Sequence, residues 1–426
     1  PARSVVLGFV ALFALVLGVA LLTPQATVVL VRGAVRRLRS LLGLLGTLAA
    51  RGVVASLSRT GPAVVALVVA VSVTVGLGAM ISSFRGTVSG WLDRTLQADV
   101  YVSLPGPGAA GPAGTIEAEL ARRIARVDGV SGASLYRSVE VEGWDGAIRV
   151  VAVRLDPRSR AAYRLVEGDG ERALSRLESG SAALVSEPFA FRRRVGVGDT
   201  VRFRTGVGPR AIPVAGVFRD YGSDRGVVVL DRGLYDRWWR DPGYSSVALF
   251  VEEGLPPDSV IGRVQRAAGP GRSLVVRSNR GLRAASLEVF DRTFAVTGVL
   301  RLLAFAVAFI GILGALMALQ LERSRELGVL RAQGLTPGQL WGVVTAQTGI
   351  LGLVSGLLAL PAGALLAVVM VHVVNRRSFG WTLDLAFGGD LVAETMILAL
   401  TGALLAGLFP AWKMARTSPA EALRGE

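Results

Sequence analysis

The stretch LERSRELGVLRAQGLTPGQL, residues 321–340, decides the fold because it places a charged helix and a sharp turn between two long apolar runs. Glu322, Arg325 and Glu326 recur at the i, i+3 and i+4 spacing of one helix face. The pattern predicts a helix with a charged face that leaves one apolar run and ends just before the next.

The end of this stretch predicts a turn and a new helix. Gly334 suits the position after a helix end, where φ is positive. Thr336 then fits the N-cap, Pro337 the first helical position and Gln339 the third, which together form a T-x-x-Q capping box. We therefore expect helix, sharp turn and helix in direct succession.

The C-terminal segment repeats this device. Ser418, Pro419 and Glu421 belong to an S-x-x-E capping box with proline at the first helical position. Two rigid, capped elements next to apolar runs indicate a docking surface for another protein. The alternative is that the charged residues only end the helices at the lipid headgroups, for which a few basic residues suffice.

The composition indicates a membrane protein. The chain has 426 residues, of which 51% are hydrophobic, and its mean hydropathy is +0.51, which is too apolar for an ordinary soluble protein of this length. A helix needs about 20 mostly apolar residues to cross a bilayer. Four such runs are clear, at 4–31, 60–84, 302–321 and 391–408.

A further apolar run, 332–375, has no formal charge. As one helix it would be about twice as long as a bilayer core is thick. We expect a capped turn followed by one long span that is kinked near Pro361. A tight hairpin of two spans remains the alternative.

Arginine placement predicts the orientation. Residues 32–59 contain six arginines and no acidic residue, so this loop is expected in the cytoplasm. Residues 85–293 then lie outside, and the tail from Pro410 lies inside. Apolar residues at helical spacing within 32–59 predict an amphipathic helix in the inner headgroup layer, or else an ordinary linker helix.

The fold class that we expect is an α-helical transmembrane bundle, with a four-helix core plus one extra N-terminal span, and a large extracytoplasmic α+β domain. In chain order the predicted parts are an extra span (1–31), a cytoplasmic amphipathic helix (32–59), core helix 1 (60–84), the outer domain (85–293), core helix 2 (294–321), a cytoplasmic coupling segment (322–340), core helix 3 (341–375), an outer loop (376–390), core helix 4 (391–409) and a cytoplasmic tail (410–426).

Residues with small side chains recur every four positions in two predicted spans, which lets helices pack closely. These stripes are Ser355, Ala359, Gly363 and Ala367, and Ala66, Ala70, Thr74 and Gly78.

The outer domain reads as a split α+β unit. It has strand-like runs such as DVYVSLP, AALVSEPF, TVRFRTG and SSVALFVE, and helix-like runs TIEAELARRIARVDG and DSVIGRVQRAAG. The order is strand, helix and strands, then a block rich in strands (182–230), then strand, helix and strand. Two such units that flank an all-β insertion indicate a split α+β domain.

Several chemistries are excluded by the sequence. The chain has no cysteine, which removes disulfides and thiol catalysis. Its only lysine, Lys413, lies outside any Gly-rich loop, so there is no Walker A motif. The only histidine is His372, at the end of an apolar run. The G-x-G-x-x-G match at 106–111 contains Pro107 and reads as a linker.

The net charge of +15 predicts contact with anionic membrane lipids and not with nucleic acid, because part of the excess lies beside the apolar spans. Neither a catalytic site nor a metal site nor a bound cofactor is expected in this chain.

At this point the residues resemble a known family. LERSRELGVLRAQGLTPGQL resembles the charged turn of FtsX-like permeases, the membrane subunits of a class of ABC transporters, and FPAWKMARTSPAEALRGE resembles their C-terminal signature. The outer domain is similar to the MacB-like periplasmic core in ADVYV, ALVSEPFAFRRRVGVGDTVRF and VAGVFRDYG. The similarity covers roughly residues 45–426. The span before it indicates the second half of a long member with two such halves.

The resemblance implies a cell-membrane protein with a separate cytoplasmic ATP-binding partner, which would hold the ATP. Five charged residues would face that ATPase: Glu322, Arg323, Arg325, Glu326 and Arg331. Leu327 and Leu330 would pack the turn. The capped turn, with Gly334, Thr336 and Pro337, would belong to the same interface. Ser418, Pro419 and Glu421 would cap the cytoplasmic tail. A second permease half or a homodimer partner, and an extracytoplasmic partner protein, are further expectations.

Three functions remain open at this stage. The first is export or extraction of a lipid, lipoprotein, peptide or hydrophobic compound. The second is mechanotransmission without transport, in which the outer domain regulates a cell-wall hydrolase. The third is a receptor or scaffold without an ATPase, against which the capped turn argues.

Overall fold

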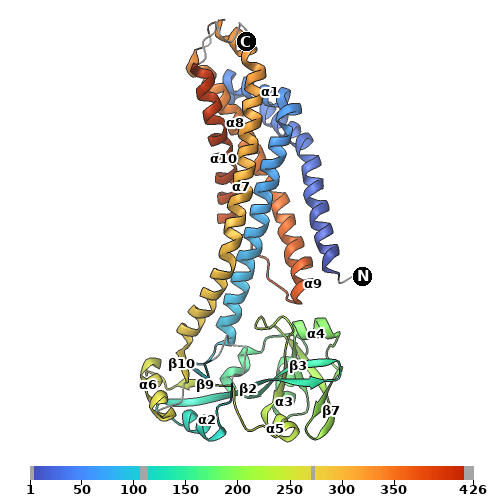
Figure 1. Cartoon of the computed structure of the whole chain (residues 1–426), viewed down its shortest axis with the longest axis vertical. Coiled ribbons are helices and arrows are strands. Elements are labelled where there is room, and N and C mark those ends of the chain that lie inside the picture. Colours follow the sequence, from blue (N-terminus) through green and yellow to red (C-terminus); the bar gives the residue numbers. More distant parts are fainter. Residues whose placement is uncertain (1–3, 106–113, 270–273, 333, 335, 417–426) are drawn as a thin grey trace. The chain divides into compact units, whose positions relative to one another are not determined.

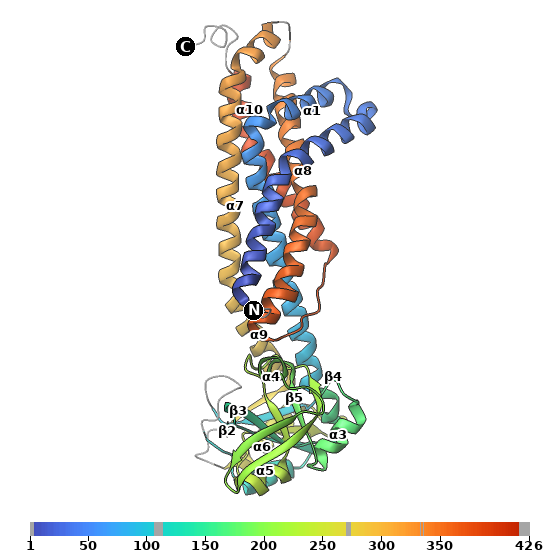
Figure 2. The same ribbon diagram turned by 90° about the vertical axis from the view of Figure 1, so that its right-hand side faces the viewer.

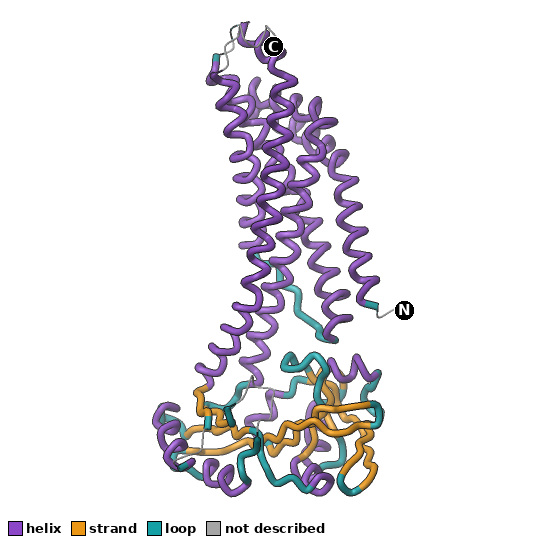
Figure 3. The backbone as a smooth tube through the Cα atoms, in the orientation of Figure 1, coloured by secondary structure: helices purple, strands orange, loops and turns teal. Residues whose placement is uncertain are grey.

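The computed structural model describes residues 4–105, 114–269, 274–332, 334 and 336–416. The chain packs as two compact units. The helical unit comprises the residues up to Phe84, Thr293–Arg377 and the residues from Leu383 onward; the sheet unit comprises Arg85–Arg292 and Ser378–Thr382. All strands belong to the sheet unit, as the orange segments of Figure 3 show.

Long helices make up the helical unit (Figure 1). They are α1 (Val5–Thr95), α7 (Asn279–Ala332), α8 (Pro337–Val369) and α10 (Gly389–Arg416), and α8 continues through a π-helical turn (Met370–Asn375) into α9 (Arg376–Phe379). α1 and α7 also supply residues to the sheet unit.

Four helical stretches of the described residues are long and apolar enough to cross a membrane: Val5–Arg36, Thr60–Thr95, Gly338–Phe379 and Gly389–Leu408. α7 contains the further apolar run 302–321. The region after the capped turn is one continuous helix and not a hairpin, and Pro361 lies inside it.

The helices approach one another where side chains are small. Ser355, Ala359 and Ala367 are fully buried, so the stripe predicted on α8 is a packing face. A Cβ atom built on Gly363 would lie 2.5 Å from the Cβ of Val75 on α1. In the stripe predicted on α1, Ala70 and Thr74 are buried. The close approach to α8 is made by the neighbouring Val75 and Gly76.

The ten strands found among the described residues of the sheet unit form one sheet. They are β1 (Val100–Ser103), β2 (Val130–Gly143), β3 (Gly146–Arg154), β4 (Leu165–Glu167), β5 (Ala183–Ser186), β6 (Thr200–Thr205), β7 (Gly208–Phe218), β8 (Val228–Asp231), β9 (Ser246–Val251) and β10 (Val275–Ser278). Their order is β10-β1-β9-β2-β3-β8-β5-β7-β4, with β6 beside β2 and β7. β3–β8 and β5–β7 are the parallel pairs among them.

Short helices cover this sheet: α2 (Ala118–Ala125), α3 (Gly170–Glu178), α4 (Glu187–Arg193), α5 (Arg232–Trp239), α6 (Pro257–Ala268) and a 3-10 turn (Pro157–Ala162). Alternation is clear in β6, where Val201 and Phe203 are buried and Arg202 and Arg204 are exposed. In α2, buried Leu120 and Ile124 are one turn apart.

The predicted split α+β domain is confirmed, because β1 lies between β9 and β10 and the helices α2 and α6 share one hydrophobic core with them. The insertion between them is not all-β, however. It contains α3, α4 and α5, and the run AALVSEPF, read as one strand, is β5 followed by the start of α4. Ser186 precedes α4, and Pro188 stands in its first turn.

Arg232 is the largest fully buried side chain of the sheet unit, with 1% of its surface exposed. Its guanidinium donates to the carbonyl of Gly243 (2.8 Å) and to that of Asp241 (2.5 Å), and pairs with Asp236 at 2.8 Å. It also lies over the ring of Tyr244, 4.3 Å from the centroid. One side chain therefore holds the start of α5 to the loop before β9.

We expect Arg232→Ala to destabilise the sheet unit by about 3 kcal/mol or more, since two buried carbonyls lose their donor. Thermal unfolding of the full chain in detergent, followed by tryptophan fluorescence, measures this. Arg237→Ala is the control, because Arg237 is exposed on the same helix. Equal melting of both variants would contradict the prediction.

Candidate functional site

The turn between α7 and α8 has the predicted backbone. α7 ends at Ala332, Gly334 has φ +104° and α8 begins at Pro337. The Thr336 hydroxyl accepts from the amide of Gln339 at 3.3 Å, and the Gln339 side chain accepts from the amide of Thr336 at 3.0 Å. The predicted capping box and the left-handed glycine are therefore confirmed.

The five charged residues and the two leucines of the predicted coupling segment belong to the last turns of α7: Glu322, Arg323, Arg325, Glu326 and Arg331; Leu327 and Leu330. The structure does not describe the side chains of these residues, so their role at an ATPase interface stays a prediction. Ser418, Pro419 and Glu421 lie outside the described residues altogether.

Sequence reasoning missed a second site, in which the sheet unit binds the segment Ser378–Thr382 that leads from α9 towards α10. The Glu187 carboxylate accepts from both the backbone amide (3.3 Å) and the hydroxyl of Thr382. The Tyr221 hydroxyl donates to the Thr382 carbonyl at 2.7 Å, and Arg192 donates to the Ser378 carbonyl at 2.9 Å. We call Glu187, Arg192, Tyr221 and the bound segment the clasp.

Aromatic rings fix the clasp further. Trp381 stacks on Phe379, with ring centroids 5.0 Å apart, and meets Tyr221 edge-on at 5.9 Å. Tyr221 in turn meets Trp91, in the part of α1 that belongs to the sheet unit, at 5.9 Å. Such pairs each add about 0.5–1.5 kcal/mol beyond the buried area.

Glycine permits the close approach at the centre of the clasp. Gly380 has φ +77°, and a Cβ atom built there would lie 3.0 Å from the Cα of Pro188. A residue with a side chain would be strained in this conformation and crowded against α4. The clasp therefore combines charged hydrogen bonds, ring contacts and a glycine turn.

Asp220, the residue before Tyr221, carries a perturbed carboxyl group. Burial raises its pKa to about 6, although a hydrogen bond from the amide of Gly222 and the charge of Arg149 act in the opposite direction. The amide of Gly222 donates at 3.0 Å. The loop beside the clasp is therefore the place where the sheet unit titrates near pH 6.

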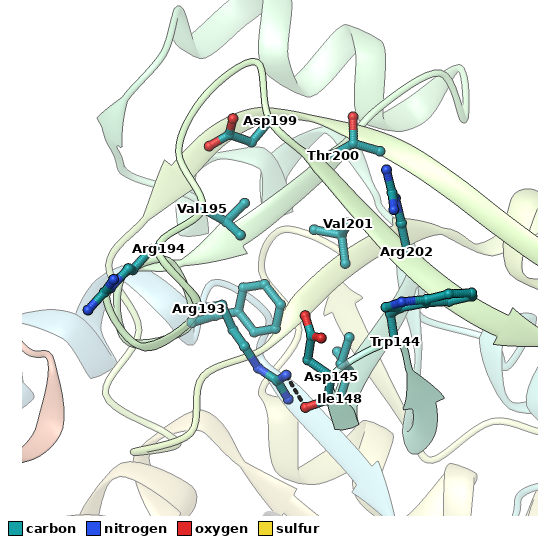
Figure 4. Close-up of a pocket in the computed structure, with 11 residues that line it drawn as sticks. Trp144, Asp145, Ile148, Arg193, Arg194, Val195, Asp199, Thr200, Val201 and Arg202 are labelled. Carbon is teal, nitrogen blue, oxygen red and sulfur yellow. Dashed lines mark hydrogen bonds between the residues drawn. The ribbon is translucent and has the colours of Figure 1, made fainter.

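A cavity of about 400 Å³ opens beside α4, as Figure 4 shows. It is lined by Arg193 and Arg194 from the end of α4, Arg202 from β6, the exposed ring of Trp144, and Asp145 and Asp199. Arg193 donates to the backbone carbonyls of Asp145 and Ala147. Arg194 stands in the left-handed region, with φ 57°.

A second cavity, of about 500 Å³, shares Ile148, Phe189 and Arg193 with the first and reaches Tyr221 and Trp381 of the clasp. Arginines, carboxylates and aromatic rings line both, a set suited to polar and amphiphilic ligands. Among the described residues no three His, Asp or Glu side chains gather to hold a metal ion.

We expect Glu187→Ala to release the bound segment, because Thr382 loses a charged acceptor for two hydrogen bonds. Amide hydrogen exchange of a peptide covering Trp381 and Thr382 should become roughly tenfold faster or more. Glu119→Ala is the control, since Glu119 has a mostly exposed side chain on α2. Unchanged exchange in Glu187→Ala would show that the carboxylate does not hold the segment.

Asp220→Asn should change how stability depends on pH. The folded-state pKa of Asp220 is about 6, whereas the ordinary pKa of an aspartate carboxyl is 3.8. Folding therefore takes up a proton between about pH 4 and pH 6, and raising the pH through this window destabilises wild type by at most about 3 kcal/mol. Melting temperatures of both proteins at pH 4.5 and pH 7.5 should show that Asp220→Asn is more stable, relative to wild type, at pH 7.5 than at pH 4.5. The same difference in melting temperature at both pH values would contradict this.

Two family models match the chain. The FtsX-like permease C-terminal model matches residues 298–419, and the MacB-like periplasmic core domain model matches residues 60–267. The first covers the capped turn, α8 and α10. The second covers most of the sheet unit.

Curated relatives agree with these matches. The chain is 37% identical over 430 residues to an uncharacterised ABC transporter permease protein of Mycobacterium tuberculosis, which covers all of this chain and 50% of that protein. It is 27% identical over 146 residues to the lipoprotein-releasing system transmembrane protein LolC of Xylella fastidiosa, covering 31% of this chain and 35% of that protein. The chain thus spans about half the length, or less, of these two relatives.

Among solved structures, the periplasmic region of MacB from Actinobacillus actinomycetemcomitans matches with a TM-score of 0.34 at 10% identity, over 45% of this chain and 94% of that one. The family matches, together with the apolar helices and the α+β sheet unit, show that the protein is a multi-pass membrane protein with a large extracytoplasmic domain. The chain belongs to the FtsX-like ABC transporter permeases that carry a MacB-like periplasmic core domain.

Proposed function

We propose that this chain couples ATP hydrolysis by a separate cytoplasmic ATPase to movement of its extracytoplasmic domain. The observation that carries the proposal is the rigid capped turn between α7 and α8, which lies in the region that the FtsX-like permease model matches. A capped turn keeps its shape when force is applied to it, because its backbone groups are already paired.

The sequence supports a division of labour between two chains. With Lys413 as its only lysine, this chain has no P-loop lysine to bind nucleotide phosphates. The ATP would therefore bind to the partner, and the residues from Glu322 to Pro337 would transmit the movement without any catalysis of their own.

Three routes connect the turn with the sheet unit. α7 runs from Asn279, at the edge of the sheet, to Ala332 beside the turn, and α1 also contributes to both units. The third route is the clasp, because α8 leads through α9 into the bound segment. A helix whose hydrogen bonds are complete transmits displacement along its axis.

The work done by this movement is proposed to be export or extraction of a lipid, lipoprotein, peptide or hydrophobic compound. The partial similarity to a protein named for lipoprotein release favours an amphiphilic cargo. The two adjacent cavities of the sheet unit, with Arg193 between them, offer both charged and aromatic surface for such a cargo. A second permease half or a second copy of the chain would complete the assembly.

Mechanotransmission without transport is the second candidate. The clasp favours mechanotransmission specifically, because it would let a movement of the spans reach the sheet unit without any bound cargo. In that case an extracytoplasmic partner such as a cell-wall hydrolase would bind the sheet unit. A receptor or scaffold without an ATPase is the third candidate, and the capped turn argues against it.

The decisive experiment purifies the tagged full chain from its own membrane in mild detergent and assays for a bound ATPase. Wild type should retain an ATP-hydrolysing protein. Replacing Glu322, Glu326 and Arg331 with alanine should reduce its recovery at least tenfold, because charged interface contacts are worth about 1–3 kcal/mol each.

The matched control replaces two glutamates and one arginine that are exposed on the sheet unit, Glu119, Glu171 and Arg172, with alanine. This control should bind the ATPase as wild type does. If wild type with an intact fold recovers no ATPase, the coupling proposal fails and the charged turn only ends a helix.

A further inference from the structure

A cavity of about 460 Å³ lies in the helical unit, where α1 bends back on itself. Figure 2 shows this bend in the blue part of the chain. Arg32 and Arg36 come from the segment that ends the first apolar run, and Arg51 comes from the returning segment. The cavity thus collects three guanidinium groups from two helical segments.

In the part of the chain that the structure describes, these cations have no counter-ion. Arg32, Arg36 and Arg51 are exposed, and no hydrogen bond or ion pair of theirs occurs among the described residues. Residues 32–59 contain no acidic residue that could pair with them. Three like charges around one cavity repel each other unless an anion is bound between them.

The other walls of the cavity are apolar. Val31 is 1% exposed, and Val35 and Val54 pack against the same hydrophobic cluster as the membrane helices. Val29, 69% exposed, and Leu30, 37% exposed, continue the apolar surface of α1 away from the arginines. The cavity is therefore lined by both guanidinium groups and apolar side chains.

We propose that this cavity binds the headgroup of one anionic phospholipid of the cytoplasmic leaflet. The lipid phosphate lies among Arg32, Arg36 and Arg51, whose planar guanidinium groups suit phosphate oxygens. An acyl chain follows the valine wall onto the exposed apolar face of α1. A free phosphate would use the arginines but would leave that wall uncovered, so the apolar part of the site selects a lipid.

The charge pattern places the site at the inner surface, since arginine-rich loops face the cytoplasm. A bound lipid would hold the bend of α1 at the headgroup level, where the first core span begins. The proposal needs neither an ATPase nor a cargo, and it stands independently of the coupling function.

Native mass spectrometry of the purified full chain tests the proposal, with phosphatidylglycerol or phosphatidylcholine added after delipidation. Wild type should retain one phosphatidylglycerol in preference to phosphatidylcholine. Replacing Arg32, Arg36 and Arg51 together with glutamine should weaken phosphatidylglycerol retention roughly tenfold or more, since each basic residue near an anionic surface contributes about 1 kcal/mol.

A second variant keeps all three charges and fills the cavity. Ala55 is exposed and lines the cavity, so Ala55→Trp should block the lipid while the arginines remain. Leu48→Trp is the matched control, because Leu48 is 46% exposed on the same returning segment and does not line the cavity. The control should retain phosphatidylglycerol as wild type does.

Equal retention of phosphatidylglycerol by wild type and by both site variants would overturn the proposal, and so would equal retention of the two lipids by wild type. Added inorganic phosphate tests the other source of the same chemistry. If millimolar phosphate displaces the lipid from wild type, and if Ala55→Trp still binds phosphate, the arginines form an anion site and not a lipid site.

Discussion

The helical unit depends on backbone contacts that only glycine allows. Lipid tails are as apolar as the side chains, so spans associate through close packing and not through the hydrophobic effect. Gly363 of α8 meets Val75 of α1, and Gly407 of α10 would place a Cβ atom 2.4 Å from the Cγ2 of Thr348 on α8. α8 therefore packs closely against helices on two sides.

This packing has a consequence for movement. Interfaces without spare volume shift as units and do not deform continuously. A displacement of the capped start of α8 would be shared with α1 and α10, whose backbones touch it. The clasp adds to this, because the chain continues from α8 and α9 into the segment that Glu187 holds.

Features that depend on near neighbours could be predicted from the sequence. Thr336 and Gln339 form their capping box within four residues, and the apolar runs reveal the spans by length alone.

β2 could not be predicted in this way, because buried positions in it are polar. Ser134 bonds to Ser159, and Arg137 pairs with Asp241 at 2.7 Å, so partners remote in sequence stabilise the strand. The clasp joins residues 195 positions apart, for which no local pattern exists.

The arginines show why net charge alone is a poor guide to partners. Lysine is nearly absent, and several guanidinium groups bridge two backbone carbonyls at once. Arg232 joins Gly243 and Asp241, Arg193 joins Asp145 and Ala147, and Arg192 joins Asp224 and Ser378. A lysine ammonium lacks the planar fork that spans two acceptors in fixed geometry. These three arginines thus hold loops together.

Arg32, Arg36 and Arg51 differ from these structural arginines, since they line a cavity without protein acceptors among the described residues. An arginine with satisfied donors adds little attraction for a ligand, because its hydrogen-bonding capacity is already used. An arginine whose donors are free and that lies beside apolar surface favours an amphiphilic anion, which can bind to both. The bonding state of each guanidinium, and not the total charge, therefore separates the arginines that maintain the fold from those available to a membrane lipid.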